Sequence, residues 1–241
     1  MENRQINEAN DPTGKTYMAG LAIDAVIFGF HDHQLKVLLM QYKKSDIFAL
    51  PGGFIHKEEN LDTAAQRVVG QRTGLSDIYL EQFHVFGDTA RFDPTPLKSI
   101  MIANGLTPGD NHWLLQRFIS VGYYALVDFT KVTPMPDRIF DNCAWYAIAD
   151  IPKLMQDHNR IIKNALESLQ RDLDNKLVAF NLMTEEFTMN DLQTLYETIL
   201  DKKLLRPAFQ RKMLSLGVFE RIAKKWTGGA HKAPYLYKFT Q

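Results

Sequence analysis

Two stretches of the sequence combine residue types that could do chemistry. The first follows a Pro-Gly-Gly break at residues 51–53 and carries three carboxylates over residues 58–62. Carboxylate oxygens are the ligands that Mg²⁺ prefers in proteins. Carboxylates before or in the first turn of a helix are also expected simply because they favour the helix dipole. The second stretch is residues 201–241, which hold ten Lys or Arg side chains and two carboxylates. Clustered basic side chains neutralise the phosphates of nucleic acids, although they also occur on ordinary solvated helix faces.

Charge and composition constrain the kind of protein. The 241 residues include 28 basic and 28 acidic side chains, and a net charge of zero argues by itself against a nucleic-acid binder. The charges are unevenly placed, however, with a net of −4 over residues 1–179 and +4 over residues 180–241. Such asymmetry indicates two parts with different partners. The single cysteine, Cys143, excludes a disulfide framework and fits a reducing compartment. The polar N-terminus and the short apolar run at 21–30 predict neither signal peptide nor membrane span, so we expect a cytoplasmic protein.

The pattern of apolar residues predicts elements that position both stretches. In the first part, the expected strands are 22–30, 35–42, 48–54, 79–86 and 118–129, and the expected helices are 60–74 and 151–176. A connection as long as 87–116 is typical of a functional or a disordered segment. In the second part, the expected helices are 189–200 and 207–216, and the expected strands are 219–225 and 235–239. With the helix at 151–176 before them, these elements give helix, helix, short turn, helix and hairpin, which is the order of a winged helix-turn-helix.

The first stretch resembles the Nudix box, G-x5-E-x7-R-E-U-x-E-E-x-G-U, where U is bulky and apolar. The matching residues are Gly53, Glu59, Arg67, Gly74 and Leu75. In Nudix hydrolases the box is a loop–helix–loop whose glutamates hold Mg²⁺ against a nucleoside diphosphate. Here the three glutamate positions are Val68, Gln71 and Arg72, which offer no carboxylate. The resemblance therefore implies a Nudix fold without catalytic residues, metal or cofactor, and we expect a protein that is not an enzyme. An active nucleoside-diphosphate hydrolase remains the alternative.

A fold that keeps this cleft without its chemistry predicts ligand binding. The candidate ligand-binding residues are Asp24, Gln41, Lys43, His56, Glu59, Asp88 and Arg91. Asp24 interrupts an apolar strand, and Gln41 and Lys43 end the next strand, although each could be a plain solvent-facing side chain. Residues 87–94 resemble the loop that reads the substrate in ADP-ribose-type Nudix domains.

The second stretch resembles the winged helix of Nudix-related transcriptional regulators of the NrtR family. Its pattern F-T-x-x-x-L-Q-x-x-Y-E-x-I-L is present as Phe187, Thr188, Leu192, Gln193, Tyr196, Glu197, Ile199 and Leu200. The following R-x-x-F-x-R-K-x-L is present as Arg206, Phe209, Arg211, Lys212 and Leu214. The resemblance covers nearly the whole chain. It implies an α+β protein with a Nudix fold, a mixed sheet between helices, over residues 1–155. A linking helix and a winged helix-turn-helix follow over residues 156–241.

Recognition helices insert their N-terminal half into the major groove, where Arg pairs with guanine and Gln with adenine. We expect Arg206, Gln210 and Arg211 to contact bases. Three apolar residues of the same helix should pack inward: Phe209, Met213 and Leu214. Expected phosphate contacts are Gln193, Lys212, Lys224, Lys225, His231 and Lys232, with residues 227–229 as the wing tip. Each of these could alone be an ordinary surface charge, and a winged helix can also contact another protein.

The NrtR resemblance also bears on the effector. Some members keep an intact box and respond to ADP-ribose or related NAD metabolites, whereas others have degenerate boxes and are associated with sugar utilisation, including arabinose-responsive members. The missing glutamates and the insertion at 97–116 favour the second group. We expect a homodimeric repressor of sugar utilisation genes that binds operator DNA and is released by L-arabinose. The alternative is a regulator that senses ADP-ribose or another NAD-related nucleotide.

Overall fold

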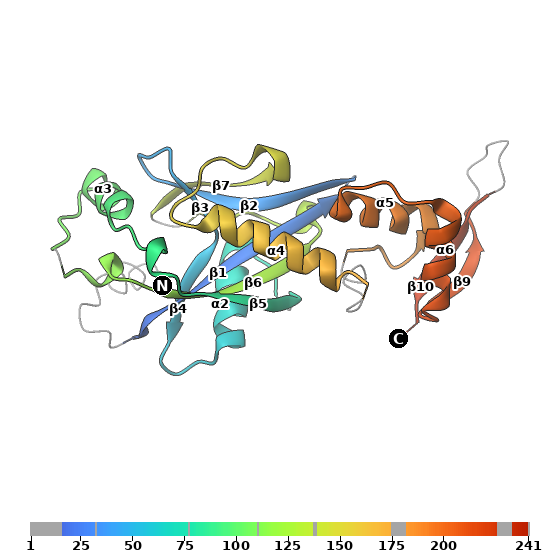
Figure 1. The fold of residues 1–241 in the computed structure, drawn as a ribbon, viewed down its shortest axis with the longest axis horizontal. Coiled ribbons are helices and arrows are strands. Elements are labelled where there is room, and N and C mark those ends of the chain that lie inside the picture. Colours follow the sequence, from blue (N-terminus) through green and yellow to red (C-terminus); the bar gives the residue numbers. More distant parts are fainter. Residues whose placement is uncertain are drawn as a thin grey trace.

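The protein is seen in a computed structural model that describes residues 16–31, 33–76, 78–109, 111–136, 139–174, 182–225 and 233–240. The molecule is elongated, with a larger N-terminal part that contains the main sheet and a smaller C-terminal part at one end (Figure 1). Over the described ranges, no helix is long and apolar enough to cross a membrane.

The N-terminal part is a mixed sheet between helices, as expected. Its strands are β1 (Tyr17–His31), β2 (Gln34–Tyr42), β3 (Phe48–Ala49), β4 (Gly52–His56), β5 (Leu80–Phe86), β6 (Ile119–Val127) and β7 (Phe140–Ala147). Its helices are α2 (Leu61–Thr73), α3 (Thr95–Ala103) and α4 (His158–Asp172). Short 3₁₀ turns are η1 (Thr89–Arg91), η2 (Trp113–Leu115), η3 (Phe129–Lys131) and η4 (Ile148–Asp150).

Strand β1 is the centre of the sheet. One edge pairs antiparallel with β2 and β4, and the other pairs in parallel with β6, giving the order β3-β2-β1-β6-β5 with β7 on β2. Alternate side chains of β1 point to opposite faces. Val26 and Phe28 pack in the cluster that includes α4, whereas Ala25 and Ile27 pack in the cluster that includes Val69 of α2. The two helices therefore cover opposite faces of the sheet.

Helix α2, which carries the box, begins and ends where its sequence predicts. The side chain of Asn60 caps its start by accepting from the Thr63 amide at 2.8 Å. Gly74 ends the helix with φ of 71°, a left-handed conformation that glycine adopts without strain.

Several expected elements differ from the structure. The strand expected at 48–54 is divided into β3 and β4 by Leu50 and Pro51, because Pro51 has no N–H for a ladder. Strand β7 was not expected. The connection at 87–116 contains α3 and two 3₁₀ turns. Helix α4 begins at residue 158 and not at 151, since Pro152 and a positive φ at Gln156 (50°) interrupt the chain before it.

The C-terminal part has the helix, helix, hairpin order expected of a winged helix. Its elements are β8 (Phe187–Thr188), α5 (Met189–Leu200), α6 (Arg206–Ser215), β9 (Phe219–Lys224) and β10 (Tyr235–Phe239). Thr188 and Asp191 form a reciprocal capping box that starts α5. Strand β10 pairs antiparallel with both β8 and β9.

One apolar core runs through both parts. Ile161 and Leu169 of α4 lie in the same cluster as the sheet residue Phe28, and that cluster continues to Leu192 of α5 and Phe209 of α6. Helix α4 crosses the sheet and points toward α5 (Figure 1). It therefore belongs to the packing of both parts, and a division between residues 155 and 156 stays a prediction.

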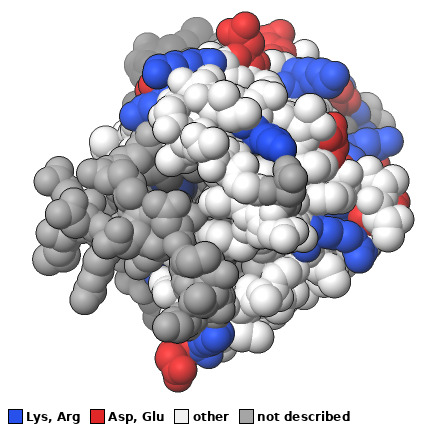
Figure 2. Space-filling view, turned by 90° about the vertical axis from the view of Figure 1, so that its left-hand side faces the viewer, with Lys and Arg blue, Asp and Glu red and all other residues white. Residues whose placement is uncertain are grey.

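The end of the molecule that faces away from the C-terminal part is seen in Figure 2. At the end that faces away from the C-terminal part, uncharged side chains occupy the middle of the surface, with Lys and Arg spaced around them (Figure 2). Helix α3 lies at this end (Figure 1), and its Ile102 is 57% exposed.

Candidate functional site

Residues that match the box form hydrogen bonds with one another and with the neighbouring backbone. Arg67 donates from Nη2 to Glu59 Oε1 at 2.5 Å and to the Phe54 carbonyl at 2.7 Å, and Glu59 Oε1 also accepts the His56 amide at 2.7 Å. Burial opposes ionisation of Glu59, but the hydrogen bonds from Arg67 and His56 outweigh it and hold the pKa of this carboxyl below its usual value. Glu59 therefore holds the turn before α2 in place.

The face of α2 that carries glutamates in the box does not fit Mg²⁺. Val68 is 1% exposed and packs on Gly53, where an added Cβ would lie 2.6 Å from Val68 Cγ2. Gln71 is exposed, and the Arg72 guanidinium lies 5.9 Å from the centre of the Phe140 ring. Among the residues that the structure describes, no three His, Cys, Asp or Glu side chains are placed to hold a metal ion. No step of a metal-dependent reaction can be assigned to this face.

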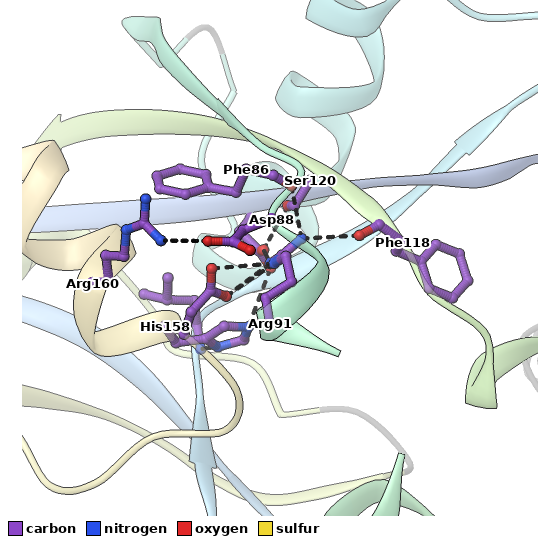
Figure 3. Close-up of polar contacts among 10 residues, drawn as sticks. Phe86, Asp88, Arg91, Phe118, Ser120, His158 and Arg160 are labelled. Atoms are coloured by element: carbon purple, nitrogen blue, oxygen red, sulfur yellow. Dashed lines mark hydrogen bonds and ion pairs between the residues drawn. The ribbon is translucent and has the colours of Figure 1, made fainter. Parts of the chain in front are cut away.

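A buried polar cluster lies on the other side of the sheet, under the start of α4 (Figure 3). Asp24 of β1, 8% exposed, accepts from Ser120 Oγ at 2.5 Å and from Arg91 Nη2 at 3.4 Å. The interpretation of Asp24 as a solvent-facing carboxylate is therefore wrong. His158 Nδ1 accepts the Leu50 amide at 3.0 Å, which places the ring proton on Nε2, 3.7 Å from Asp24 Oδ1.

Arg91 is the centre of this cluster. Its Nε and Nη2 donate to the Asp157 carboxylate at 3.0 to 3.2 Å, and its Nη1 donates to the carbonyls of Phe86 and Phe118 at 3.1 and 3.2 Å. Asp88 lies beside it, where it caps η1 through the Ala90 amide and faces Arg160 of α4 at 3.6 Å (Figure 3). One arginine thus joins the sheet, η1 and α4.

The candidate ligand-binding residues lie in three places. Asp24, Asp88 and Arg91 are together at the polar cluster. His56 and Glu59 lie at the turn between β4 and α2. The third place is the end of β2, where Gln41 donates to the Ser45 carbonyl and the Lys43 carbonyl accepts from Asn104 just after α3.

Sequence reasoning missed three members of the polar cluster: Ser120, Asp157 and His158. Each is a common residue type in an unremarkable context, and they meet Asp24 and Arg91 only through the tertiary fold. A half-buried aromatic group also lies beside the box. In it the Tyr17 ring stacks on Trp113 at 5.8 Å, and Phe54 lies 4.7 Å from Trp113.

Helix α6 carries the three residues that are expected to contact bases. Arg206, Gln210 and Arg211 are exposed, whereas Phe209 and Met213 are buried. The expectation that Leu214 packs inward is wrong, since it is 40% exposed. Residues 209 and 213 share one helix face, and the next residue is turned about 100° away from it. A shallow hollow on this helix is lined by Ala208, Arg211, Lys212 and Ser215.

The expected phosphate contacts differ in their surroundings. Lys225 is exposed, Lys224 lies 5.7 Å from the Tyr235 ring centre, and Lys212 Nζ pairs with Asp174 at 2.6 Å. His231, Lys232 and the wing tip at 227–229 lie outside the described residues.

Gln193 is a correction to the expected phosphate contacts. Its Nε2 donates to Glu197 at 2.8 Å and to the Leu204 carbonyl at 3.0 Å. Both of its N–H groups are therefore used within the chain, and it fixes the turn between α5 and α6.

Comparisons with known proteins agree with this architecture. The NUDIX domain matches residues 18–165, and the NrtR DNA-binding winged helix domain matches residues 179–239. The chain is 29% identical over 226 residues to the "ADPR responsive transcriptional repressor NtrR" of Acinetobacter baylyi, covering 91% of this chain and 81% of the relative.

Solved structures show the same similarity over most of the chain. Shewanella oneidensis NrtR superimposes with a TM-score of 0.67 at 26% identity, covering 91% of this chain and 94% of that chain. The same protein complexed with a 27mer DNA gives 0.66 at 26% identity, covering 91% and 93%. The chain therefore belongs to the Nudix family, in the NrtR arrangement of a Nudix domain followed by an NrtR winged helix domain.

Proposed function

We propose that this protein is a transcriptional repressor that binds operator DNA through α6 and the β9–β10 hairpin and is controlled by a small molecule at its Nudix domain. The observation that carries the proposal is the exposed face of α6, where Arg206, Gln210 and Arg211 stand over the buried anchors Phe209 and Met213. It is supported by the Acinetobacter relative, which is a repressor by name, and by the Shewanella structure with DNA.

The test is binding to a duplex selected from a random-sequence pool. Arg206→Ala combined with Arg211→Ala should abolish specific binding, since both guanidinium groups are on the reading face. Lys163→Ala is the matched control, because Lys163 is an exposed cation on α4, away from α6. Equal affinity of the double variant and the wild type would overturn the proposal, and would favour a winged helix that contacts another protein.

We propose further that the Nudix domain binds its ligand without hydrolysing it. Positions 68, 71 and 72 supply no carboxylate, and Glu59 is engaged by Arg67. Incubation with a panel of nucleoside diphosphates and Mg²⁺ or Mn²⁺ should give no turnover. Turnover that disappears in Glu59→Gln would establish a hydrolase instead.

The effector that we propose first is ADP-ribose, since the Acinetobacter relative is described as ADPR responsive. Arg72 places a cation on the face of α2 where the box has a glutamate, and a cation can contact a diphosphate directly, without a metal. L-arabinose is the second candidate, because the same loss of carboxylates suits a neutral pentose that needs no metal.

Calorimetry against ADP-ribose, L-arabinose and D-xylose separates the two effector classes. If ADP-ribose binds, Arg72→Gln should weaken it, because the diphosphate loses its cation, whereas a neutral sugar should bind this variant as it binds the wild type. If only a sugar gives heat on titration, ADP-ribose is not the effector, and the protein is a sugar sensor instead.

We propose that the repressor acts in the cytoplasm. We also propose that it is a homodimer, because two recognition helices related by a two-fold axis match half-sites one helical turn, or a multiple, apart. Light scattering should give twice the mass of the 27.7 kDa chain. A monomer that binds a single half-site would contradict this.

A further inference from the structure

Helix α4 begins with a carboxylate that does not serve its own helix. Asp157 occupies the N-cap position, where an Asp side chain ordinarily accepts a hydrogen bond from the second or third N–H of the helix. Here the side chain makes no cap hydrogen bond, and both of its oxygens accept from Arg91 at 3.0 to 3.2 Å. The start of α4 is therefore fastened to Arg91.

Arg91 is itself fastened to the sheet. Its remaining donors go to the carbonyls of Phe86 and Phe118 and to Asp24 of β1. It is the last residue of η1, in the 87–94 loop, directly after β5. A ligand that displaces this loop would therefore displace the guanidinium, and the two-oxygen contact with Asp157 would carry the displacement to α4.

The other end of α4 is fastened to the DNA-binding part. Gln170 donates to a carbonyl of α5 at 2.8 Å, and the Leu173 carbonyl accepts from the Tyr196 hydroxyl at 3.1 Å. Just after the helix, Asp174 pairs with Lys212 of α6 at 2.6 Å. A helix of 15 residues is about 22 Å long and moves as a rod. Its two ends therefore connect the buried polar cluster to the recognition helix.

We infer that the Arg91–Asp157 pair is the joint through which ligand binding at the Nudix domain changes the position of α6. The inference rests on the proposed function and deepens it, because it names the residues that couple the two sites. Asp157 acts through Arg91 and α4 and is thus a positioning residue. In a packed interior such a joint has discrete arrangements, so a small shift of η1 produces a rigid movement of α4.

The test removes the Arg91–Asp157 pair and preserves the start of α4. Asp157→Ser supplies a side chain that can cap α4 but cannot bind Arg91 through two oxygens. Asp157→Asn, which keeps the shape of the side chain and removes its charge, gives a second reading if the serine variant unfolds. Glu167→Gln is the matched control, since it removes an exposed carboxylate from the same helix. Each protein is titrated with operator duplex, with and without saturating ADP-ribose or L-arabinose, and ligand binding is followed separately by calorimetry.

In the wild type and in Glu167→Gln, the ligand should weaken operator binding by about 5- to 150-fold, the usual range of coupling between sites. In Asp157→Ser, the ligand should still bind, but the ratio of operator affinities should fall toward one. A wild-type ratio in both Asp157 variants would overturn the inference, and so would loss of ligand binding, which would place Asp157 in the ligand site. If neither ligand changes operator binding by the wild type, the proposed function fails, which is a different result.

Discussion

Arginine has opposite surroundings in the two parts of this protein. In the Nudix domain, all five N–H donors of Arg91 are used within the chain, by two carboxylates and two backbone carbonyls. On α6, Arg206 and Arg211 are exposed. An arginine with every donor satisfied defines a conformation, whereas an exposed arginine can bind a phosphate or a base. Net charge and residue counts do not separate these two uses, and burial does.

The largest effect is expected when one arginine of each kind is replaced in turn and the free energy of unfolding is measured. Arg91→Met should lower the free energy of unfolding by about 3–5 kcal/mol, because it leaves the buried Asp24 and the mostly buried Asp157 without their cation. Arg211→Met should change it by less than about 0.5 kcal/mol, as exposed positions usually do. Urea denaturation measures both. Equal midpoints for the two variants would show that the buried cluster does not stabilise the fold.

A smaller effect follows from the proposed contact between Gln210 of α6 and a base. Gln210→Ala should weaken binding to the preferred operator by about 1–3 kcal/mol and relax the preference at a single base pair, since the proposed bidentate contact to adenine would be lost. Competition among duplexes that differ at one position measures this. A uniform loss across all sequences would instead make Gln210 a backbone contact.

The hairpin lysines should affect salt dependence more than sequence preference. Lys225→Ala should reduce the slope of log affinity against log salt concentration by about one, because one fewer phosphate is neutralised. Binding isotherms from low to moderate salt test this, with the exposed Lys163→Ala as control. An unchanged slope would remove Lys225 from the DNA interface.

The smallest expected effect is a pH dependence at the turn before α6. Hydrogen bonds from Gln193, Leu204 and Lys203 to Glu197 lower the pKa of this carboxyl to about 2. A carboxyl whose pKa is lowered by folding stabilises the protein above its unfolded pKa, and this contribution is lost as the pH falls toward 2. Glu197→Gln should therefore lose less stability than the wild type between pH 5 and pH 2, relative to neutral pH. Parallel losses in both proteins would contradict the assignment.

Local signals in the sequence predicted the helices that carry the two motifs. Asn60 and Gly74 delimit α2, Thr188 starts α5, and Pro207 stands in the first turn of α6. Caps, helix periodicity and an initial proline are all properties of neighbouring residues, so they can be recognised in a single sequence. The Nudix fold and the winged helix were predicted from motifs that lie on these same helices.

The sequence alone does not indicate which distant residues contact one another. Arg91 and Asp157 are 66 positions apart, and neither position has a pattern that points to the other. Strand β7 was missed because its half-exposed residues do not alternate clearly, although it pairs with β2 along its length. Leu214 was misplaced because burial on a short helix depends on the neighbours that cover each face.

The contact between Gly53 and Val68 has a consequence for substitutions that would put glutamate into the box. Val68 fills the space that a side chain at position 53 would need, and it is almost completely buried. A single Val68→Glu substitution would place a carboxylate against the Gly53 backbone while positions 71 and 72 still offer no second carboxylate to hold a cation, and an unpaired buried charge is strongly unfavourable. Val68→Glu alone is therefore expected to weaken the fold.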